Sequence, residues 1–559
     1  MKENVESGPG DPWTDRTWLI LCLLFGALEA WISRYSMISD GVSYLDIGDA
    51  YFRHDWGAAI NAYWSPMYSW WLGLALYIFK PSIRWEFVTV HAVNLIIYIL
   101  ALFSFQFFLH SIIRALRDLP GSDYIPLPDS FLTGLGYSLF LWCSQVLIDV
   151  GWVGPDLLLA AFVFLIAGLL VDLRTQHSYA KFAIFGGLIG GAYLTKGIMF
   201  PLGFVFLGIL FCAGRLSKSR IYGVLLSAAI FLLVCSPFIW ALSTAKRRLT
   251  FGDTGKLAYA SLVSPGTSNV HWQGEPSGSG TPRHPTRKVL SDPPVFEFAQ
   301  PVSGTYPPWD DPSYWNEGVR PQFNLRSQVR VLVKSYFAYQ KIFLSQGGLI
   351  AGVLIFLLLG GELARKGIAS QWPLLATAGV CFATYALVLV LPRYVGASMV
   401  LLWLAVFAGI RVSGDLQLLA PVRYVTMAVA ATMLLSVVGH IADTAYTNAT
   451  VGAAPSGAEQ IRTAEGLLRM GLRAGDEVGV IGPGEIDHWA RLARFRIVAE
   501  STPANDFWIS SSPQRDSAYE HFAGIGAKAV IAWDPAVRSL DPRWHRIADT
   551  RYYAFFLRH

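Results

Sequence analysis

The sequence predicts an α-helical polytopic membrane protein with about eleven transmembrane helices, outer-interface amphipathic helices and a small C-terminal α/β domain. Of its 559 residues, 53% are hydrophobic and only 15% are charged, whereas a soluble globular chain carries roughly 25% charged residues. Apolar runs close to the length that crosses a bilayer recur along the first four-fifths of the chain. The last fifth instead alternates short apolar runs with helical stretches, which is typical of a small water-exposed α/β domain.

The apolar runs predict the spans individually. Each run is bounded by polar or turn-forming residues, and each is near or above the minimum length for a transmembrane helix. The predicted spans are 17–36, 86–113, 127–148, 155–172, 182–196, 198–214, 220–242, 343–361, 371–391, 394–412 and 423–445.

Lysine and arginine orient these spans. If segment 65–79, which is short and opens with Pro66, does not cross the bilayer, every short basic loop falls on one side. These loops are the N-terminus, 114–118, 172–181, 214–220, 362–366 and 411–423. Short basic loops are cytoplasmic, so we expect a plasma-membrane (inner-membrane) protein with a cytoplasmic N-terminus and an extracytoplasmic C-terminus. Segment 43–79 is then expected to form amphipathic helices in the outer interface.

Three regions are expected to face outward: loop 37–85, long loop 243–342 and tail 446–559. The first two belong to a predicted membrane module, 1–445. The Pro, Gly and Ser content of the long loop favours irregular structure, ending in an interfacial helix near 325–342. In the tail we expect strands at 477–481, 495–499 and 529–533, with helices near 457–472, 485–493 and 515–526.

Charge and cysteine content give no support for a nucleic-acid-binding protein, a disulfide-linked fold or a zinc-thiolate protein. The formal net charge of +5 is small for this length and gives no indication of nucleic-acid binding. All five cysteines lie in apolar stretches, so neither a disulfide framework nor a zinc-thiolate site is expected.

Four charged residues are the candidates for chemistry. Asp40 follows the first span, Asp156 lies at the start of the fourth, Lys196 lies at the end of the fifth, and Arg393 precedes the tenth. Each has an ordinary structural explanation, because acids favour helix starts and lysine or arginine can reach the interface from a span end. The predicted topology nevertheless brings all four to the outer leaflet. Two acids and two cations at one depth suit a phosphate leaving group and a hydroxyl or amine that must be deprotonated.

A set of short motifs resembles the GT-C membrane glycosyltransferases, and specifically the branch of the protein mannosyltransferases and the lipid A aminoarabinose transferase. The motifs keep their order over residues 17–412. They are Asp40 with Tyr44, Tyr63-Trp64-Ser65-Pro66-Met67-Tyr68, Pro155-Asp156-Leu157-Leu158, Leu194-Thr195-Lys196-Gly197 and Pro392-Arg393-Tyr394. A glycine follows Asp40, where the mannosyltransferases carry a second acid.

The resemblance implies an inverting transferase that moves a sugar, hexosyl or pentosyl, from a polyprenyl-phosphate carrier to a lipid, glycan or protein acceptor outside the membrane. It implies that Asp40 is the catalytic base and Asp156 a second acid of the site, with Lys196 and Arg393 at the donor phosphate. The expected lining residues are Tyr44, Tyr394, Asp149, Trp64 and Tyr68. A divalent metal ion, if the enzyme uses one, is expected at Asp40 and Asp156.

Two other functions fit a chain with many spans. A lipid or solute transporter or flippase would also carry outer charges, but it would place ionisable groups near the bilayer midplane and repeat its halves, and no such repeat is visible. A binding or assembly protein would use the tail and need fewer spans. In the long loop, 271–275 and 305–315 combine aromatic residues with acids, which suits either stacking on a sugar or packing against the membrane module.

Overall fold

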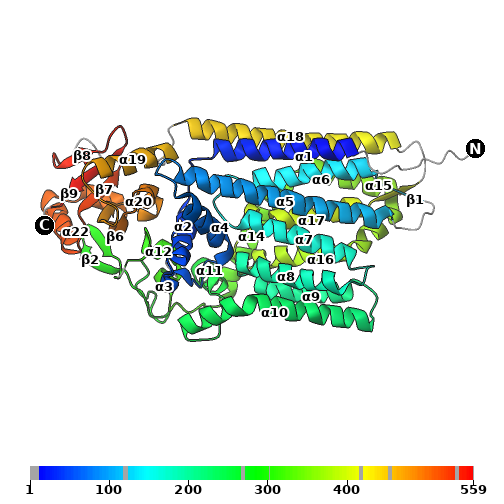
Figure 1. Cartoon of the computed structure of the whole chain (residues 1–559), viewed down its shortest axis with the longest axis horizontal. Helices are drawn as coiled ribbons and strands as arrows, with labels where there is room; N and C mark the ends of the chain where they lie inside the picture. Colours follow the sequence, from blue (N-terminus) through cyan, green and yellow to red (C-terminus); the bar gives the residue numbers. More distant parts are fainter. Residues whose placement is uncertain are drawn as a thin grey trace, which may run out of the picture.

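A bundle of long helices makes up most of the molecule, and a layer containing a β-sheet covers one end of it (Figure 1). The computed structural model describes residues 12–117, 124–265, 271–300, 302–413, 419–450, 456–535 and 541–557. The helices of the bundle are α1 (Pro12–Ile32), α5 (Glu86–Arg117), α6 (Asp129–Leu141) with the π-helix η1 (Trp142–Leu147), α7 (Asp156–Asp172), α8 (Tyr179–Thr195), α9 (Met199–Cys212), α10 (Lys218–Lys246), α15 (Gly347–Ser370), α16 (Trp372–Ala386), α17 (Pro392–Gly409) and α18 (Leu419–Ala449).

Each predicted span overlaps one of these helices, with ends that differ by several residues, and the helical fold class is confirmed. Among the described residues, 6 helices are long and apolar enough to cross a membrane by themselves, and α9 and α16 are shorter apolar helices. The number that cross the bilayer therefore stays a prediction. Helix α15 runs past the predicted end of its span and is kinked at Gly361, where φ is 53°.

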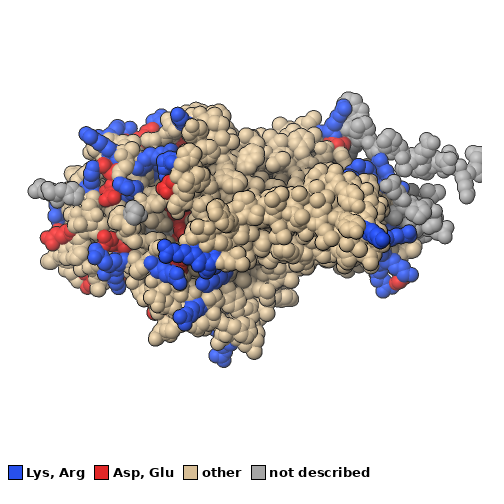
Figure 2. Space-filling view, turned by 60° about the horizontal axis from the view of Figure 1, so that its bottom comes forward, with Lys and Arg blue, Asp and Glu red and all other residues tan. Residues whose placement is uncertain are grey.

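One face of the bundle is almost free of charge. Figure 2 shows Lys, Arg, Asp and Glu at the two ends of the molecule and uncharged residues between them. Large apolar side chains are exposed along the bundle, including Leu358 (85% exposed), Trp240 (73%) and Leu233 (66%). In water such a surface would be unfavourable by roughly 25 cal/mol per Å² of apolar area. The chain is therefore a multi-pass membrane protein.

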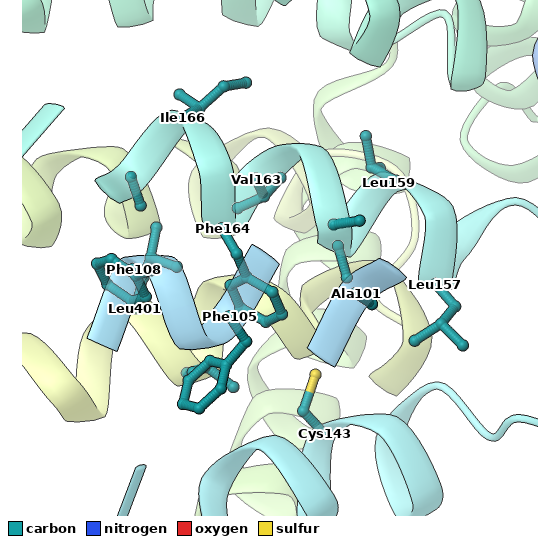
Figure 3. Packing of buried hydrophobic residues seen from close by; sticks show 14 of the residues in the cluster. Ala101, Phe105, Phe108, Cys143, Leu157, Leu159, Val163, Phe164, Ile166 and Leu401 are labelled. Carbon is teal, nitrogen blue, oxygen red and sulfur yellow. The ribbon is translucent and has the colours of Figure 1, made fainter. Parts of the chain in front are cut away.

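The bundle core is packed around α5, α7 and α17 (Figure 3). Phe105 and Phe108 of α5 and Phe164 of α7 are all 0% exposed, and the ring centroids of Phe105 and Phe164 lie 5.4 Å apart, edge to face. Because α5 and α7 pack so closely, the ends of these helices nearest the sheet are fixed relative to one another. One of those ends carries Asp156.

Two short helices, α2 (Ser39–Phe52) and α4 (Pro66–Phe79), lie between the bundle and the sheet, linked through α3 (Trp56–Ala59) (Figure 1). They cross at two glycines: a Cβ added to Gly48 would stand 2.7 Å from the carbonyl oxygen of Ser69 and 3.0 Å from the nitrogen of Gly73. Only glycine permits this approach. The far end of α4 exposes the apolar side chains of Ile78 (60%) and Phe79 (70%), and the position of this helix in the outer interface stays a prediction.

The sheet has seven strands in the order β2-β3-β6-β5-β7-β9-β8. Strands β6, β5 and β7 are parallel, and the outer pairings are antiparallel. The strands are β2 (Arg287–Ser291), β3 (Pro294–Glu297), β5 (Glu477–Ile481), β6 (Arg496–Ser501), β7 (Ala529–Trp533), β8 (Trp544–Arg546) and β9 (Tyr552–Phe556), and the helices packed on them are α19 (Gly457–Arg469), α20 (His488–Ala493), α21 (Ala504–Ile509) and α22 (Ser512–Gly524), with the 3₁₀ turn η3 (Gly484–Ile486).

The long loop is more ordered than its composition predicts. Its strands β2 and β3 extend the sheet of the tail, with Phe296 opposite Glu500 and Glu297 opposite Ala499. It also forms α11 (Thr254–Leu262), α12 (Pro307–Asp310) and α13 (Ser313–Asn316), and it ends in the predicted helix α14 (Leu325–Leu344). A second small sheet pairs β1 (Tyr124–Pro126) with β4 (Arg411–Ser413). Loop and tail thus share one sheet, while the division of the chain at residue 446 remains a proposal.

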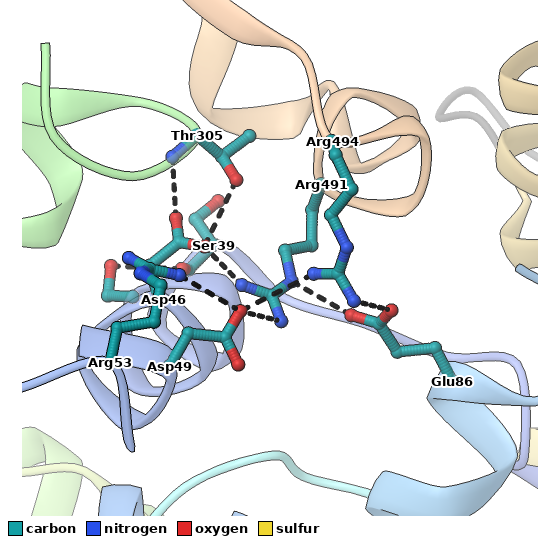
Figure 4. Close-up of polar contacts among 9 residues, drawn as sticks. Ser39, Asp46, Asp49, Arg53, Glu86, Thr305, Arg491 and Arg494 are labelled. Carbon is teal, nitrogen blue, oxygen red and sulfur yellow. Dashed lines mark hydrogen bonds and ion pairs between the residues drawn. The ribbon is translucent and has the colours of Figure 1, made fainter. Parts of the chain in front are cut away.

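A buried cluster of ion pairs connects the tail to the membrane module (Figure 4). Arg491 of α20 contacts Asp46 and Asp49 of α2 and Glu86 of α5, with 2.8 Å from its Nη2 to Asp49 Oδ2 and from its Nε to Glu86 Oε1. Its side chain is 2% exposed. Arg494 donates to the other oxygen of Glu86 at 2.7 Å. Since α2 also carries Asp40, these contacts connect the position of the tail to that of Asp40.

Candidate active site

Four helix ends meet where the bundle joins the sheet layer, and each contributes one predicted residue. Asp40 is in the first turn of α2, Asp156 is the first residue of α7, Lys196 caps the C-terminus of α8, and Arg393 is the second residue of α17. Three of these ends are N-termini, whose partial positive charge favours an anion. The structure therefore brings the four predicted residues together.

The two acids and two cations form a connected group. Lys196 Nζ lies 2.5 Å from Asp156 Oδ1, and Arg393 Nε lies 3.4 Å from Asp156 Oδ2. Arg393 Nη2 is 3.9 Å from Asp40 Oδ2. The Asp156 side chain is 4% exposed, whereas that of Asp40 is 28% exposed. Asp156 is thus held between the two cations, and Asp40 is the carboxylate that a substrate can reach.

Aromatic rings also contact the two cations. Lys196 Nζ lies 3.7 Å from the ring centroid of Tyr394, and Tyr385 stacks on Tyr394 with 5.2 Å between centroids. The guanidinium of Arg393 lies 4.1 Å above the ring of Trp152. Such cation–π contacts add to the ion pairs with Asp156 in positioning the two cations.

Tyr44, Trp64 and Tyr68 form an aromatic group behind Asp40. The ring of Tyr44 lies edge-on to Trp64 at 4.9 Å and to Tyr68 at 5.0 Å. Burial raises the pKa of the Tyr44 hydroxyl well above its usual value, and the negative charges of Asp40 and Asp156 raise it further. Tyr44 therefore remains a protonated hydrogen-bond donor close to both acids.

The environment of Asp40 favours a basic carboxylate. Burial raises the pKa of this carboxyl, Arg393 opposes that shift, Asp156 adds to it and Lys196 opposes it again. A carboxylate whose pKa lies above its ordinary value is a stronger proton acceptor near neutral pH. Its charge and partial exposure are suited to deprotonating an acceptor group.

The loop before Asp156 is held by hydrogen bonds from α5. Asn94 donates through Nδ2 to the carbonyl oxygens of Val150 and Trp152, at 3.2 and 3.1 Å, and accepts at 2.7 Å from the hydroxyl of Tyr68. Tyr68, which we predicted to line the site, is 0% exposed and contacts the supporting residue Asn94.

A cavity of about 460 Å³ lies in the sheet layer, between the long loop and the tail. Its wall combines three aromatic residues with three acids, namely Phe296, Tyr306, Trp315, Glu275, Glu485 and Glu500. The backbone oxygen of Glu485 accepts a hydrogen bond of 2.8 Å from the hydroxyl of Ser39. Because Ser39 directly precedes Asp40 in the sequence, this bond links one wall of the cavity to the start of α2. Burial raises the pKa of Glu485 to about 7, with contributions from Glu500 and Asp40.

Sequence reasoning missed Trp152, Tyr385 and Glu485. Trp152 lies in the turn between Asp149 and Asp156, and its place between two candidate acids could have indicated a role in the site. Tyr385, in contrast, is an ordinary aromatic residue of the predicted span 371–391. Glu485 belongs to the tail, and nothing in its neighbourhood indicated proximity to Asp40. Asp149, predicted as a lining residue, lies instead with Glu29 and His440.

The Asp40 and Asp156 pair is a poor fit for a divalent cation. Lys196 occupies one oxygen of Asp156, and Arg393 faces the other as well as Asp40. Two cations already balance the two carboxylates, so a dication would add uncompensated positive charge. The expectation of a metal at these two residues stays a prediction.

Comparisons with known proteins bear on the fold. No family model and no curated protein matches the sequence. Among solved structures, ArnT from Cupriavidus metallidurans in the apo state superposes with a TM-score of 0.53 at 13% identity, over 96% of this chain and 97% of that chain. The same protein bound to undecaprenyl phosphate gives 0.53 at 12% identity over the same shares. An oligosaccharyltransferase from Archaeoglobus fulgidus, tethered with an acceptor peptide, gives 0.48 at 12% identity, over 93% of this chain and 69% of that one. The chain has the GT-C fold.

Proposed function

We propose that this GT-C chain is an inverting glycosyltransferase that moves a sugar from a polyprenyl-phosphate donor to an acceptor outside the membrane. The observation that carries the proposal is the arrangement at the four helix ends. A reachable carboxylate, Asp40, stands beside two cations, Lys196 and Arg393, that are held by Asp156 and aromatic rings. The fold of ArnT, one structure of which contains undecaprenyl phosphate, agrees with a lipid-phosphate donor.

Each group has one role in the proposed reaction. Asp40 accepts the proton of the acceptor hydroxyl or amine as that group attacks the anomeric carbon of the sugar. The bond from the anomeric carbon to the phosphate oxygen breaks, and its electron pair leaves with the polyprenyl phosphate. Lys196 and Arg393 stabilise the charge that develops on this phosphate. A single displacement inverts the configuration of the anomeric carbon.

Asp156 is proposed to position the cations. Its two oxygens face Lys196 and Arg393, and a lysine ammonium has three donors, so Lys196 can bind Asp156 and a phosphate oxygen together. The acceptor is proposed to approach from the cavity of the sheet layer, because Glu485 joins its wall to the start of α2. The transporter alternative gains no support from this geometry, since the four groups lie at helix ends.

Lys196→Met is expected to weaken binding of undecaprenyl phosphate roughly 10- to 100-fold. The loss corresponds to one charge-assisted hydrogen bond, and methionine keeps the length and apolar stem of lysine. Microscale thermophoresis of the purified protein with undecaprenyl phosphate measures it. Lys196→Arg should retain most of the affinity, and Lys288→Met in the cavity wall should leave it unchanged. Absence of binding to the wild-type chain would refute the proposed donor.

The orientation of the chain is proposed to place the sheet layer outside. A cysteine placed at Asp516 in α22 should react with a membrane-impermeant maleimide added to intact cells, whereas one at Lys218 should react only after the cells are opened. The native cysteines are replaced beforehand, since Cys212 is exposed. Labelling of residue 218 in intact cells would reverse the topology and place Asp40 in the cytoplasm.

A further inference from the structure

Three residues from distant parts of the sequence gather beside the candidate active site without belonging to it. Glu29 is in the last turns of α1, Asp149 follows η1, and His440 is in α18. One carboxylate oxygen from each acid and one ring nitrogen of the histidine lie within 4.8 Å of one another. Figure 1 shows α1 and α18 side by side along the bundle, so the group joins two neighbouring helices to the loop that leads to Asp156.

Within the part of the chain that the structure describes, two buried atoms of this group have no hydrogen-bond partner. They are Oε2 of Glu29, whose residue is 0% exposed, and Nε2 of His440. The other oxygen of Glu29 accepts from Ser33 Oγ at 3.3 Å, and Asp149 Oδ1 accepts from the Gly151 amide at 2.7 Å. Leaving a carboxyl oxygen and an imidazole nitrogen without partners in a buried site is costly.

We propose that Glu29, Asp149 and His440 bind one divalent transition-metal ion of the zinc class. Two carboxylates and one imidazole are a donor set that zinc accepts, with a position left for water. Two ionised carboxylates and one dication also sum to zero net charge, which lowers the cost of burying the group. Magnesium does not suit this set, because it prefers oxygen ligands and retains its water.

The backbone at Asp149 supports a functional constraint. Its φ is +71°, in the left-handed region that non-glycine residues seldom adopt. The surrounding structure must maintain that conformation, and it turns the Asp149 carboxylate toward Glu29 and His440. A bound ion would supply part of the energy that maintains it.

The bound ion would position the loop from Asp149 to Asp156. That loop carries Trp152, whose ring contacts the guanidinium of Arg393, and it ends at Asp156, the ion-pair partner of Lys196. The metal would therefore act on the active site through the loop, with no contact to substrate. The site stands on its own geometry and would exist whatever reaction the chain catalyses.

Zinc binding by the full-length protein tests this assignment. The protein is purified with its affinity tag removed, treated with a chelator, desalted and titrated with zinc, and the bound metal is counted by mass spectrometry of the digested sample. One zinc per chain is expected. Glu29→Gln and His440→Gln should each weaken zinc binding by about 10- to 100-fold or more. Loss of a residue that only hydrogen-bonds to a metal ligand already costs that much, and these two residues are proposed as ligands themselves. His177→Gln, an exposed histidine, should leave affinity unchanged.

Two outcomes would overturn the proposal: wild-type protein that retains no more zinc than the His440→Gln chain, or wild-type affinity in both variants. If the variants do not yield monodisperse protein, X-ray absorption at the zinc edge of the wild-type chain decides. One imidazole nitrogen with oxygen ligands is expected, whereas sulfur or several imidazoles would place the ion elsewhere. Chelation should also lower the thermal midpoint of the wild-type chain, and excess magnesium should not restore it.

Discussion

Asp40→Asn is expected to lower the kcat of sugar transfer by roughly 10³-fold, the size of effect that loss of a general base produces. The amide has nearly the shape of the carboxylate but cannot take a proton, and the only ion pair of Asp40 that the described residues show is the 3.9 Å approach to Arg393. Folding should therefore be retained. Transfer from a polyprenyl-phosphate sugar donor to an acceptor, measured under saturating donor, reports the loss.

Asp55→Asn is the matched control for this prediction. Asp55 lies in the same outer segment and caps α3 by accepting a hydrogen bond from the Ala58 amide at 3.3 Å. Asparagine caps helices as well as aspartate does, so this variant should keep wild-type kcat and stability. Undiminished turnover in Asp40→Asn would exclude Asp40 as the base. Unchanged binding of undecaprenyl phosphate in that variant would assign its defect to proton transfer.

Arg491→Leu is expected to destabilise the folded protein by about 3–5 kcal/mol, the usual cost of removing one partner of a buried charge group. Asp46, Asp49 and Glu86 would lose their common cation, and the side chains of Asp46 and Glu86 are 4% and 1% exposed. The thermal unfolding midpoint in detergent measures this loss. Sugar transfer should fall as well, because α2 carries both Asp46 and Asp40.

Arg462→Leu supplies the comparison for a surface ion pair. Arg462 pairs with Asp549 at 3.2 Å, and their side chains are 44% and 77% exposed. Such pairs contribute about 0–1 kcal/mol, so the midpoint should barely change. Adding Glu86→Gln to Arg491→Leu should recover part of the lost stability by removing one uncompensated charge. An Arg491→Leu chain as stable as the wild type would mean that the tail does not depend on this cluster.

Much of the helical bundle could be predicted because the bilayer restricts what a chain can do. A spanning segment must be apolar and must satisfy its own backbone hydrogen bonds, so a run of hydrophobic residues almost always means a helix. The charges between spans are confined to helix ends for the same reason, and this brought Asp40, Asp156, Lys196 and Arg393 to one level. The strands at 477–481, 495–499 and 529–533 were visible through their apolar, β-branched runs.

The long loop illustrates why other parts could not be predicted. Strand β3 is stabilised by pairing with β6, about two hundred residues away, and it is only 4 residues long and begins with a proline, so its own sequence is a weak indication of a strand. Pairing across such distances depends on the whole sheet, whereas local composition reports only local preference. The same applies to Glu485, which reaches the site through a hydrogen bond between its backbone and Ser39.

The sequence by itself determined the membrane-spanning class, the candidate spans and which charged residues lie at helix ends, because these follow from hydrophobicity along the chain. Only the tertiary structure decided which charges pair, Lys196 with Asp156 and Arg491 with Asp46 and Glu86, and that Asp149 lies beside Glu29 and His440. The physical reason is that the interaction energy of two charged groups depends on the distance between them and on how deeply they are buried. Neither quantity exists until segments hundreds of residues apart, as Arg491 and Asp46 are, have packed together.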